Sequence, residues 1–160
     1  MSRFARAAVL GAFLLSLARL SAAEPRSDFD RVDFSITLKD LAAAAAGERQ
    51  LPQGRLFILD GTVTSLSFLD KEEASFRVRA ELMSGEWIGL EDVKSYTCVV
   101  TFSGSEWFPI FPARPPRNPP PGTVLANSRV IVVARPLGVI AEPGGPKVVS
   151  LEGLALRLLQ

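Results

Sequence analysis

Alternation between apolar and polar residues is the main pattern of the chain from residue 56 onward, and it predicts a β-rich domain. Between residues 76 and 83 the even positions are apolar and the odd positions are mostly charged, and residues 96–103 again carry apolar side chains at even positions. A period of two is typical of a strand that buries one face and exposes the other. Together with three further apolar segments, the pattern predicts strands at residues 56–69, 76–83 with a continuation to Ile88, 96–103, 130–134 and 148–158.

Glycine and proline mark the points where these strands bend or end. Residues 130–134 form a continuous apolar run, as expected for a strand covered on both faces, and we expect that strand to stop at Pro136. In the last strand the apolar phase switches around Gly153, which predicts a β-bulge at that glycine. Gly61 inside the first strand is interpreted as a second point of curvature.

The segment before the strands predicts one short helix. Thr37 or Asp40 is a candidate cap for a helix that runs through Leu41–Ala46, and Gly47 would end it. The alanines of this run favour the helix, because Ala has the highest helix propensity. Residues 32–38 also alternate as a strand does, and a strand followed by a helix satisfies both patterns.

Residues 104–122, between the third and fourth strands, are rich in proline and aromatic residues. Proline at this density excludes a regular helix or central strand and favours extended polyproline conformation. Aromatic and arginine side chains here, with Trp87 at the end of the second strand, are the candidate ligand-binding residues. The structural alternative is that the aromatics plug one end of a barrel and the prolines stiffen a crossover. The candidates are Trp87, Trp107, Phe108, Phe111, Arg114 and Arg117.

The order of these elements predicts an all-β fold with one short N-terminal helix, arranged as a five-stranded, OB-like, partly open barrel. A small β-sandwich is the alternative architecture. Over about residues 55–158 the chain resembles small exported bacterial OB-fold proteins and, weakly, anticodon-binding-like OB modules. The resemblance rests on Gly61-Thr62-Val63, on residues 122–132 before and within the fourth strand, and on Leu151-Glu152-Gly153. It implies a binding module that uses a strand face and the adjacent loops.

The first 23 residues have the three parts of a secretory signal. Arg3 and Arg6 precede a short apolar run, and Ser21-Ala22-Ala23 provides small residues before Glu24. We therefore expect a signal peptide at 1–23, an arm with the short helix at 24–54, and the barrel at 55–160, with the protein periplasmic or secreted. Whether the signal is cleaved or kept as an anchor stays open at this point.

Composition removes several classes of chemistry. The chain has no histidine, which excludes Ser-His-Asp and Cys-His catalysis and the commonest general base. Cys98 is the single cysteine, so the chain has no internal disulfide, and its place on an apolar strand face predicts an inert buried thiol. No residue pattern predicts a catalytic site, a metal site or a cofactor, and we expect a protein that is not an enzyme.

Charge shapes the expectation about partners. The predicted signal holds three of the 18 basic residues and none of the 17 acidic ones, so the remaining chain carries a formal charge of −2 rather than +1. Such a chain lacks the basic footprint that nucleic-acid binding usually needs. The leading hypothesis is therefore a module for a protein, peptide or glycan of the cell envelope. A single-stranded nucleic-acid-binding OB protein and an assembly component recruited through the proline-rich segment are the alternatives.

Overall fold

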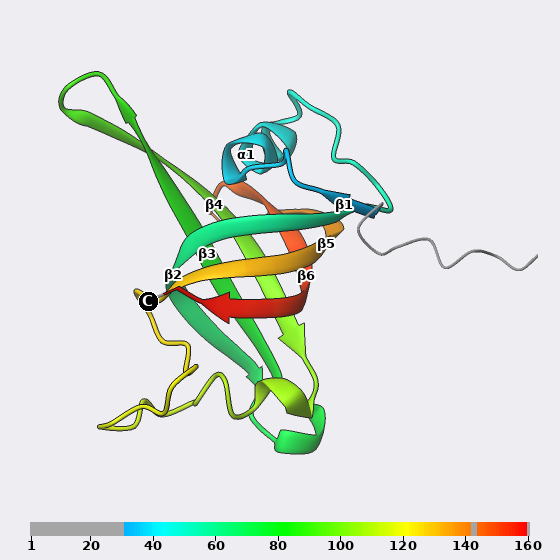
Figure 1. The fold of residues 1–160 in the computed structure, drawn as a ribbon. Helices are drawn as coiled ribbons and strands as arrows, with labels where there is room; N and C mark the ends of the chain where they lie inside the picture. The colour runs from blue at the N-terminus through cyan, green and yellow to red at the C-terminus, as the bar shows by residue number, and fades with distance from the viewer. Residues whose placement is uncertain (1–30, 142–143, 160) are drawn as a thin grey trace, which may run out of the picture.

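The computed structural model describes residues 31–141 and 144–159. In this part of the chain six strands and one α-helix form a single curved sheet with a helix over one of its ends (Figure 1). Two short 3₁₀ turns, η2 (Glu73–Ser75) and η3 (Ser105–Trp107), follow the second and fourth strands. The α-helix is α1 (Leu38–Ala46), and the strands are β1 (Val32–Asp33), β2 (Leu56–Asp70), β3 (Arg77–Ile88), β4 (Asp92–Ser103), β5 (Arg129–Ala141) and β6 (Lys147–Leu158).

The pairing of β2 with β5 closes the sheet into a barrel. The strands run in the order β1-β2-β3-β4-β6-β5, and residues 57–62 of β2 pair antiparallel with residues 129–134 of β5. Only β4 and β6 pair in parallel within the ring, over four residue pairs between 98–101 and 149–152. This confirms the predicted OB-like, partly open barrel and excludes the β-sandwich. The two-residue β1, parallel to β2, is a sixth strand beside the five predicted for the barrel, and it falls within residues 32–38, where the alternation allowed a strand before the helix.

Two predicted strand limits were wrong. β5 continues through Pro136 to Ala141, although the prediction ended it at the proline. The pairing with β6 shifts register between Pro136 and Gly138, and proline is tolerated at such a bulge because the ladder does not need its missing N–H there. β4 begins at Asp92, before the predicted start at Tyr96, because it pairs with β3 without interruption as far as the Ile88–Asp92 pair.

The helix forms where the sequence predicts it. Thr37 caps it by accepting a hydrogen bond from the backbone N–H of Asp40, the Asp40 carboxylate accepts one from the Thr37 N–H, and Gly47 ends the helix in the left-handed conformation. Its buried residues join the same apolar core as the strands. The helix packs on β4 and β6 of the barrel. The buried helix residues are Leu38, Leu41, Ala44 and Ala45.

The segment with η3 lies at the end of the barrel opposite α1 (Figure 1), and aromatic side chains pack together there. The Phe102 ring lies 4.5 Å from the ring of Trp107 and 5.0 Å from that of Phe111, measured between centroids. Phe102 and Phe111 have no exposed surface, and Trp107 is 7% exposed. Trp107 and Phe111 therefore plug one end of the barrel, as the structural alternative in the sequence analysis expected. Burying such rings contributes more to stability than leaving them exposed to solvent.

The predicted bulge at Gly153 is confirmed, and the glycine has a packing reason as well. The β5–β6 register shifts between Val133 and Ala134, opposite Ala155 and Gly153. A Cβ atom built on Gly153 would lie 2.2 Å from Cε1 of Phe102, which is far inside van der Waals contact. The ring of Phe102 therefore occupies the space that any other residue at position 153 would need.

We predict that Gly153→Ala destabilises the fold by about 1–3 kcal/mol, the usual cost of overpacking a core. The midpoint of urea unfolding, followed by tryptophan fluorescence, measures the change. Ala155→Ser, at an exposed position of the same strand, is the control and should leave the midpoint unchanged. A Gly153→Ala protein as stable as the parent would show that Phe102 has room to move.

Candidate nucleic-acid interface

The outer face of β2, β3 and β4 carries a shallow groove of about 160 Å³. Its floor is formed by short polar side chains of these strands around Val99, and Pro146, in the connection between β5 and β6, borders it. OB barrels use the corresponding central strands and the adjacent loops for ligands. The lining residues are Ser65, Ser67, Arg79, Glu81, Thr97, Val99, Pro146 and Val148.

The charged residues of this face alternate with core residues along β3. Arg77 is exposed, and Arg79 and Glu81 are half-buried, while Val78 and Ala80 between them are fully buried. The Glu81 carboxylate accepts a hydrogen bond of 3.1 Å from the Ser65 hydroxyl on β2. Hydroxyl, arginine and carboxylate groups thus share one surface, where an extended polar ligand could lie across the strands.

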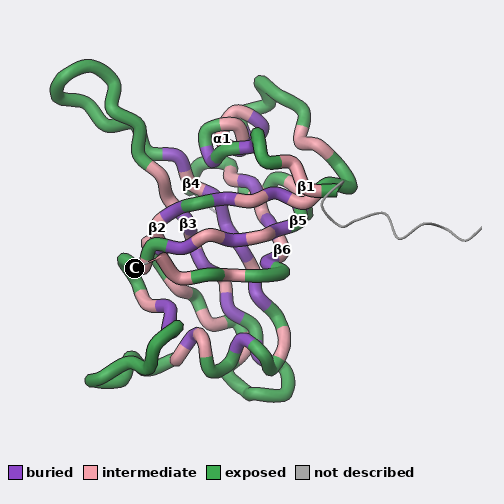
Figure 2. Tube along the Cα trace, in the orientation of Figure 1, coloured by how far each residue is buried: buried purple, intermediate pink, exposed green. Residues whose placement is uncertain are grey.

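Beyond the barrel β3 and β4 continue as a two-stranded arm, whose tip is exposed (Figures 1 and 2). Trp87 is 71% exposed and lies opposite Val93 in the register. Because side chains alternate along a strand, Trp87 belongs to the same series of positions as Arg77 and Arg79. At ~3.3 Å per residue, the eight residues from Arg79 to Trp87 span about 26 Å. Trp87 is therefore an exposed aromatic ring in the same alternating series of positions as the arginines of the grooved face.

A hydrogen-bonded cluster fixes the base of the arm to the helix. The Glu86 carboxylate accepts hydrogen bonds of 2.8 Å from Lys39 Nζ of α1 and from the Tyr96 hydroxyl. These two bonds, with that from Lys39 first, hold the pKa of Glu86 below its ordinary value, and the bond to Glu86 raises the pKa of Tyr96. Tyr96 is 7% exposed and faces the interior, so it does not form an aromatic platform with Trp87.

The structure separates the six predicted ligand-binding residues. Trp107 and Phe111 are core residues and present no stacking surface to a ligand. Phe108 is 40% exposed and lines, with Arg114, a second pocket of about 550 Å³ that the proline-rich loop forms with Lys71. Arg117 is exposed on the same loop but does not line that pocket. Trp87 lies apart from all of them, on the arm.

Sequence reasoning missed the short polar residues of the groove, although their alternation along the strands was the signal that could have found them. The alternation in residues 76–83 and 96–103 puts Arg79, Glu81 and Thr97 at odd positions, on the strand faces that point away from the core. Ser65 and Ser67 were not separated from the rest of β2. The groove depends on how three strands are paired. The alternation of residues along one strand carries no information about that pairing.

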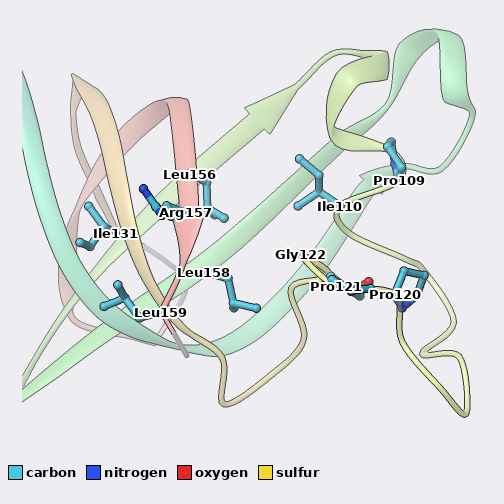
Figure 3. A pocket seen from close by; sticks show the side chains of 11 residues that line it. Pro109, Ile110, Pro120, Pro121, Gly122, Ile131, Leu156, Arg157, Leu158 and Leu159 are labelled. Carbon is cyan, nitrogen blue, oxygen red and sulfur yellow. The ribbon is translucent and has the colours of Figure 1, made fainter.

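A third and larger cavity, of about 1040 Å³, lies between the proline-rich loop and the last strand (Figure 3). Prolines and Ile110 of the loop face Leu156, Leu158 and Leu159 across it. It opens beside the C-terminal part of β6. This part follows the four residue pairs that join β6 to β4, and among the described strands it pairs only with β5. Arg157 is the one charged residue in its lining, so the cavity is mainly apolar.

Ion pairs reduce the basic character of the C-terminal third. Arg129 Nη2 lies 2.8 Å from an oxygen of Asp60 on β2, and Arg135 pairs with Glu152 across β5 and β6. Both are exposed pairs, which contribute little to stability. They still neutralise two of the cations that would otherwise form a basic face on these strands.

Cys98 is fully buried, as predicted for an inert thiol. Burial, with a smaller contribution from the charge of Glu81, raises its pKa to about 12. Within residues 31–141 and 144–159 there is no group of three or more Cys, Asp and Glu side chains arranged to hold a metal ion. The helix in this part of the chain is not long and apolar enough to cross a membrane.

Comparison with known proteins finds similarity in solved structures alone. No family model matches the chain, and no curated protein matches it. A small single-stranded DNA-binding protein from Streptomyces coelicolor is 15% identical with a TM-score of 0.40, covering 64% of this chain and 90% of that one. A deletion mutant of the single-stranded DNA-binding protein from Thermus aquaticus is 12% identical with a TM-score of 0.41, covering 66% of this chain and 49% of that one.

The N-terminal domain of PriB protein from Thermoanaerobacter tencongensis is 13% identical with a TM-score of 0.38, covering 66% of this chain and 96% of that one. At these identities the likeness concerns the fold. Two of these three structures are named as single-stranded DNA-binding proteins, against the leading hypothesis of an envelope protein, peptide or glycan ligand and against the expectation that nucleic acid is disfavoured. The formal charge of −2 is an average over residues 24–160 and does not describe the charge of any one face.

We predict that Cys98 does not react with iodoacetamide in the native protein at pH 8, because with a pKa of about 12 almost none of it is thiolate and the side chain has no access to solvent. Mass spectrometry of the alkylated protein measures the result. The control is the same reaction in about 8 M urea, which should unfold the domain and allow complete labelling of the thiol. Native labelling at the unfolded rate would show that the strand carrying Cys98 opens readily.

Proposed function

We propose that the protein binds single-stranded nucleic acid along the outer face of β3 and β4 and on the arm. The observation that carries the proposal is the exposed ring of Trp87 on the strand that also carries Arg77 and Arg79. Proteins that bind single strands combine cations that follow the backbone with aromatic rings on which bases stack. The span of about 26 Å from Arg79 to Trp87 suits a site of several nucleotides, since OB-folds bind ~4–16.

The chemistry of the face supports binding without base-specific readout. Hydroxyl groups of Ser67 and Thr97 offer hydrogen bonds to phosphate and sugar oxygens. Stacking on Trp87 is tolerant of sequence, because every base has a π face. Acidic residues at the tip, Glu91 and Asp92, oppose a polyanion and limit the affinity there. Binding is proposed as the whole activity, in keeping with a sequence that has no histidine for general base catalysis.

Trp87→Ala is expected to weaken binding of a fluorescein-labelled oligothymidylate about 5- to 150-fold, the loss of one stacked base at ~1–3 kcal/mol. Fluorescence anisotropy at low salt measures the dissociation constant. Leu90→Ala is the matched control, because Leu90 is 97% exposed at the tip of the same arm but has no ring to stack. Lack of binding by the parent protein at low salt would end the proposal.

Charge at the tip provides an independent test of where the strand lies. Glu91→Gln with Asp92→Asn should strengthen binding of the same oligonucleotide and increase the salt dependence only slightly, since neutralising an acid adds no cation contact. Arg77→Gln should weaken binding and reduce the slope of log affinity against log salt by about one contact, ~0.7 for single strands. Unchanged affinity in both variants would move the binding path away from β3 and the arm.

We also propose that the protein works outside the cytosol, as a periplasmic or secreted member of the small OB-fold proteins. The support is the positive start, short apolar run and small residues before Glu24 in the sequence, which lie outside the described residues. The expected mature protein begins at Glu24. Cell fractionation followed by N-terminal sequencing checks this, with Ala23→Leu as the variant that should block processing. Full-length protein recovered only from the cytosol would overturn export.

A further inference from the structure

A separate pocket lies between the proline-rich loop and the turn after β2. Its lining combines the Phe108 ring with prolines and with two cationic side chains, Lys71 and Arg114, and it includes no acidic residue. It shares no lining residue with the groove on β2, β3 and β4. We propose that this pocket binds one nucleotide, with the base against Phe108 and a phosphate at Lys71 and Arg114. The ligand class rests on the proposed function.

The aromatic wall of the pocket is held in place. The Phe108 ring packs edge-to-face on Phe76, with centroids 5.5 Å apart and planes at 89°. Phe76 is itself buried in the core, at 1% exposure. The backbone N–H of Phe108 donates to the carbonyl of Ser105 at 3.2 Å in the turn that follows η3. A ring fixed in this way loses little conformational entropy when a flat ligand stacks on it.

The proline-rich loop is tied to itself at its far end. The Val124 N–H donates to the Ile110 carbonyl at 2.8 Å, and the Thr123 N–H donates to the Pro120 carbonyl at 3.2 Å. Val124 is fully buried, so this end of the loop is anchored in the core. Prolines between these points restrict the backbone further, because their φ angle is locked. The pocket therefore exists before any ligand enters.

Charge selects an anion. Among the described residues, neither Lys71 nor Arg114 takes part in an ion pair, whereas the basic residues Arg129 and Arg135 do. The acids nearest in sequence to Lys71 do not line the pocket; they are Asp70, Glu72 and Glu73. Arginine and lysine are the usual phosphate-binding side chains, and both stand beside an apolar surface here.

Size and chemistry together select a nucleotide. The volume of about 550 Å³ lies within the range of small-molecule sites, ~300–1,000 Å³. An aromatic wall with two cations matches a ligand that has a flat ring and an anionic group, and Asn118 adds an amide that can donate to and accept from a base edge. Inorganic phosphate satisfies only the cations, and a nucleoside satisfies only the ring.

Isothermal titration of the folded protein with AMP, adenosine and inorganic phosphate tests the proposal. AMP should bind at least about tenfold more tightly than either of the others, since each lacks one half of the complementary chemistry. Phe108→Ala should weaken the affinity for AMP about tenfold or more. Phe108→Tyr, which keeps an aromatic ring, should bind AMP as the parent does, and the pair of variants separates loss of stacking from loss of fold. Arg114→Gln should reduce the preference for AMP over adenosine, because only Lys71 then remains to hold the phosphate.

Matched controls come from the same chain. Arg117→Gln removes a cation of the same loop that does not line the pocket, and Phe34→Ala removes a ring that is 65% exposed elsewhere. Neither should change AMP affinity. Equal affinity for AMP and phosphate, or unchanged AMP affinity in Phe108→Ala, would overturn the nucleotide site.

Failure of the nucleotide pocket and failure of the proposed oligonucleotide site on β3, β4 and the arm give different results. Trp87→Ala should weaken oligothymidylate but leave AMP binding as in the parent, because Trp87 is on the arm and outside this pocket. AMP binding without any oligonucleotide binding would leave the pocket in place and refute the proposed function. Oligonucleotide binding that depends on Trp87, with no AMP binding, would do the reverse.

Discussion

The contact between the Phe102 ring and the bare backbone of Gly153 organises this barrel. The ring leaves no room for a Cβ atom on β6, so β4 and β6 approach each other over the four residue pairs that join them in parallel. Phe102 then serves as the surface on which Trp107 and Phe111 pack. A single close approach thus connects the closure of the sheet to the aromatic plug that follows β4, and through the plug to the start of the proline-rich loop.

The two ends of the barrel are filled by different parts of the chain, and this leaves the sides for ligands. The capped helix α1 buries its apolar face at one end, and the aromatic residues after η3 fill the other. Helix, strands and plug share one core, so the arm of β3 and β4 projects from a rigid base. The bonds of Glu86 to Lys39 and Tyr96 extend that base to the point where the arm leaves the barrel. Exposed Trp87 is therefore held at a defined place rather than on a free loop.

Comparison of sequence and structure at particular residues shows where pattern reading succeeds. The alternation in residues 76–83 and 96–103 predicted which side chains enter the core, because a strand has a fixed period of two and one face must leave water. The helix cap at Thr37 and the helix end at Gly47 were also predictable, because both depend only on residues close by in the sequence. Pro136 misled the prediction because a proline ends a regular strand but not a bulged one. Net charge is a weak guide to a ligand face, because an average over the chain does not describe one face.

The sequence by itself determined the strands, the short helix, the bulge at Gly153 and the absence of histidine chemistry, all of which depend on residue type and near neighbours. Only the tertiary structure decided which aromatics face water. Trp87, Trp107, Phe108 and Phe111 are chemically alike, yet Phe111 is fully buried and Trp87 is 71% exposed. The physical reason is that burial depends on which distant segments meet: the plug residues meet Phe102, whereas the arm extends past the last strand that could cover it.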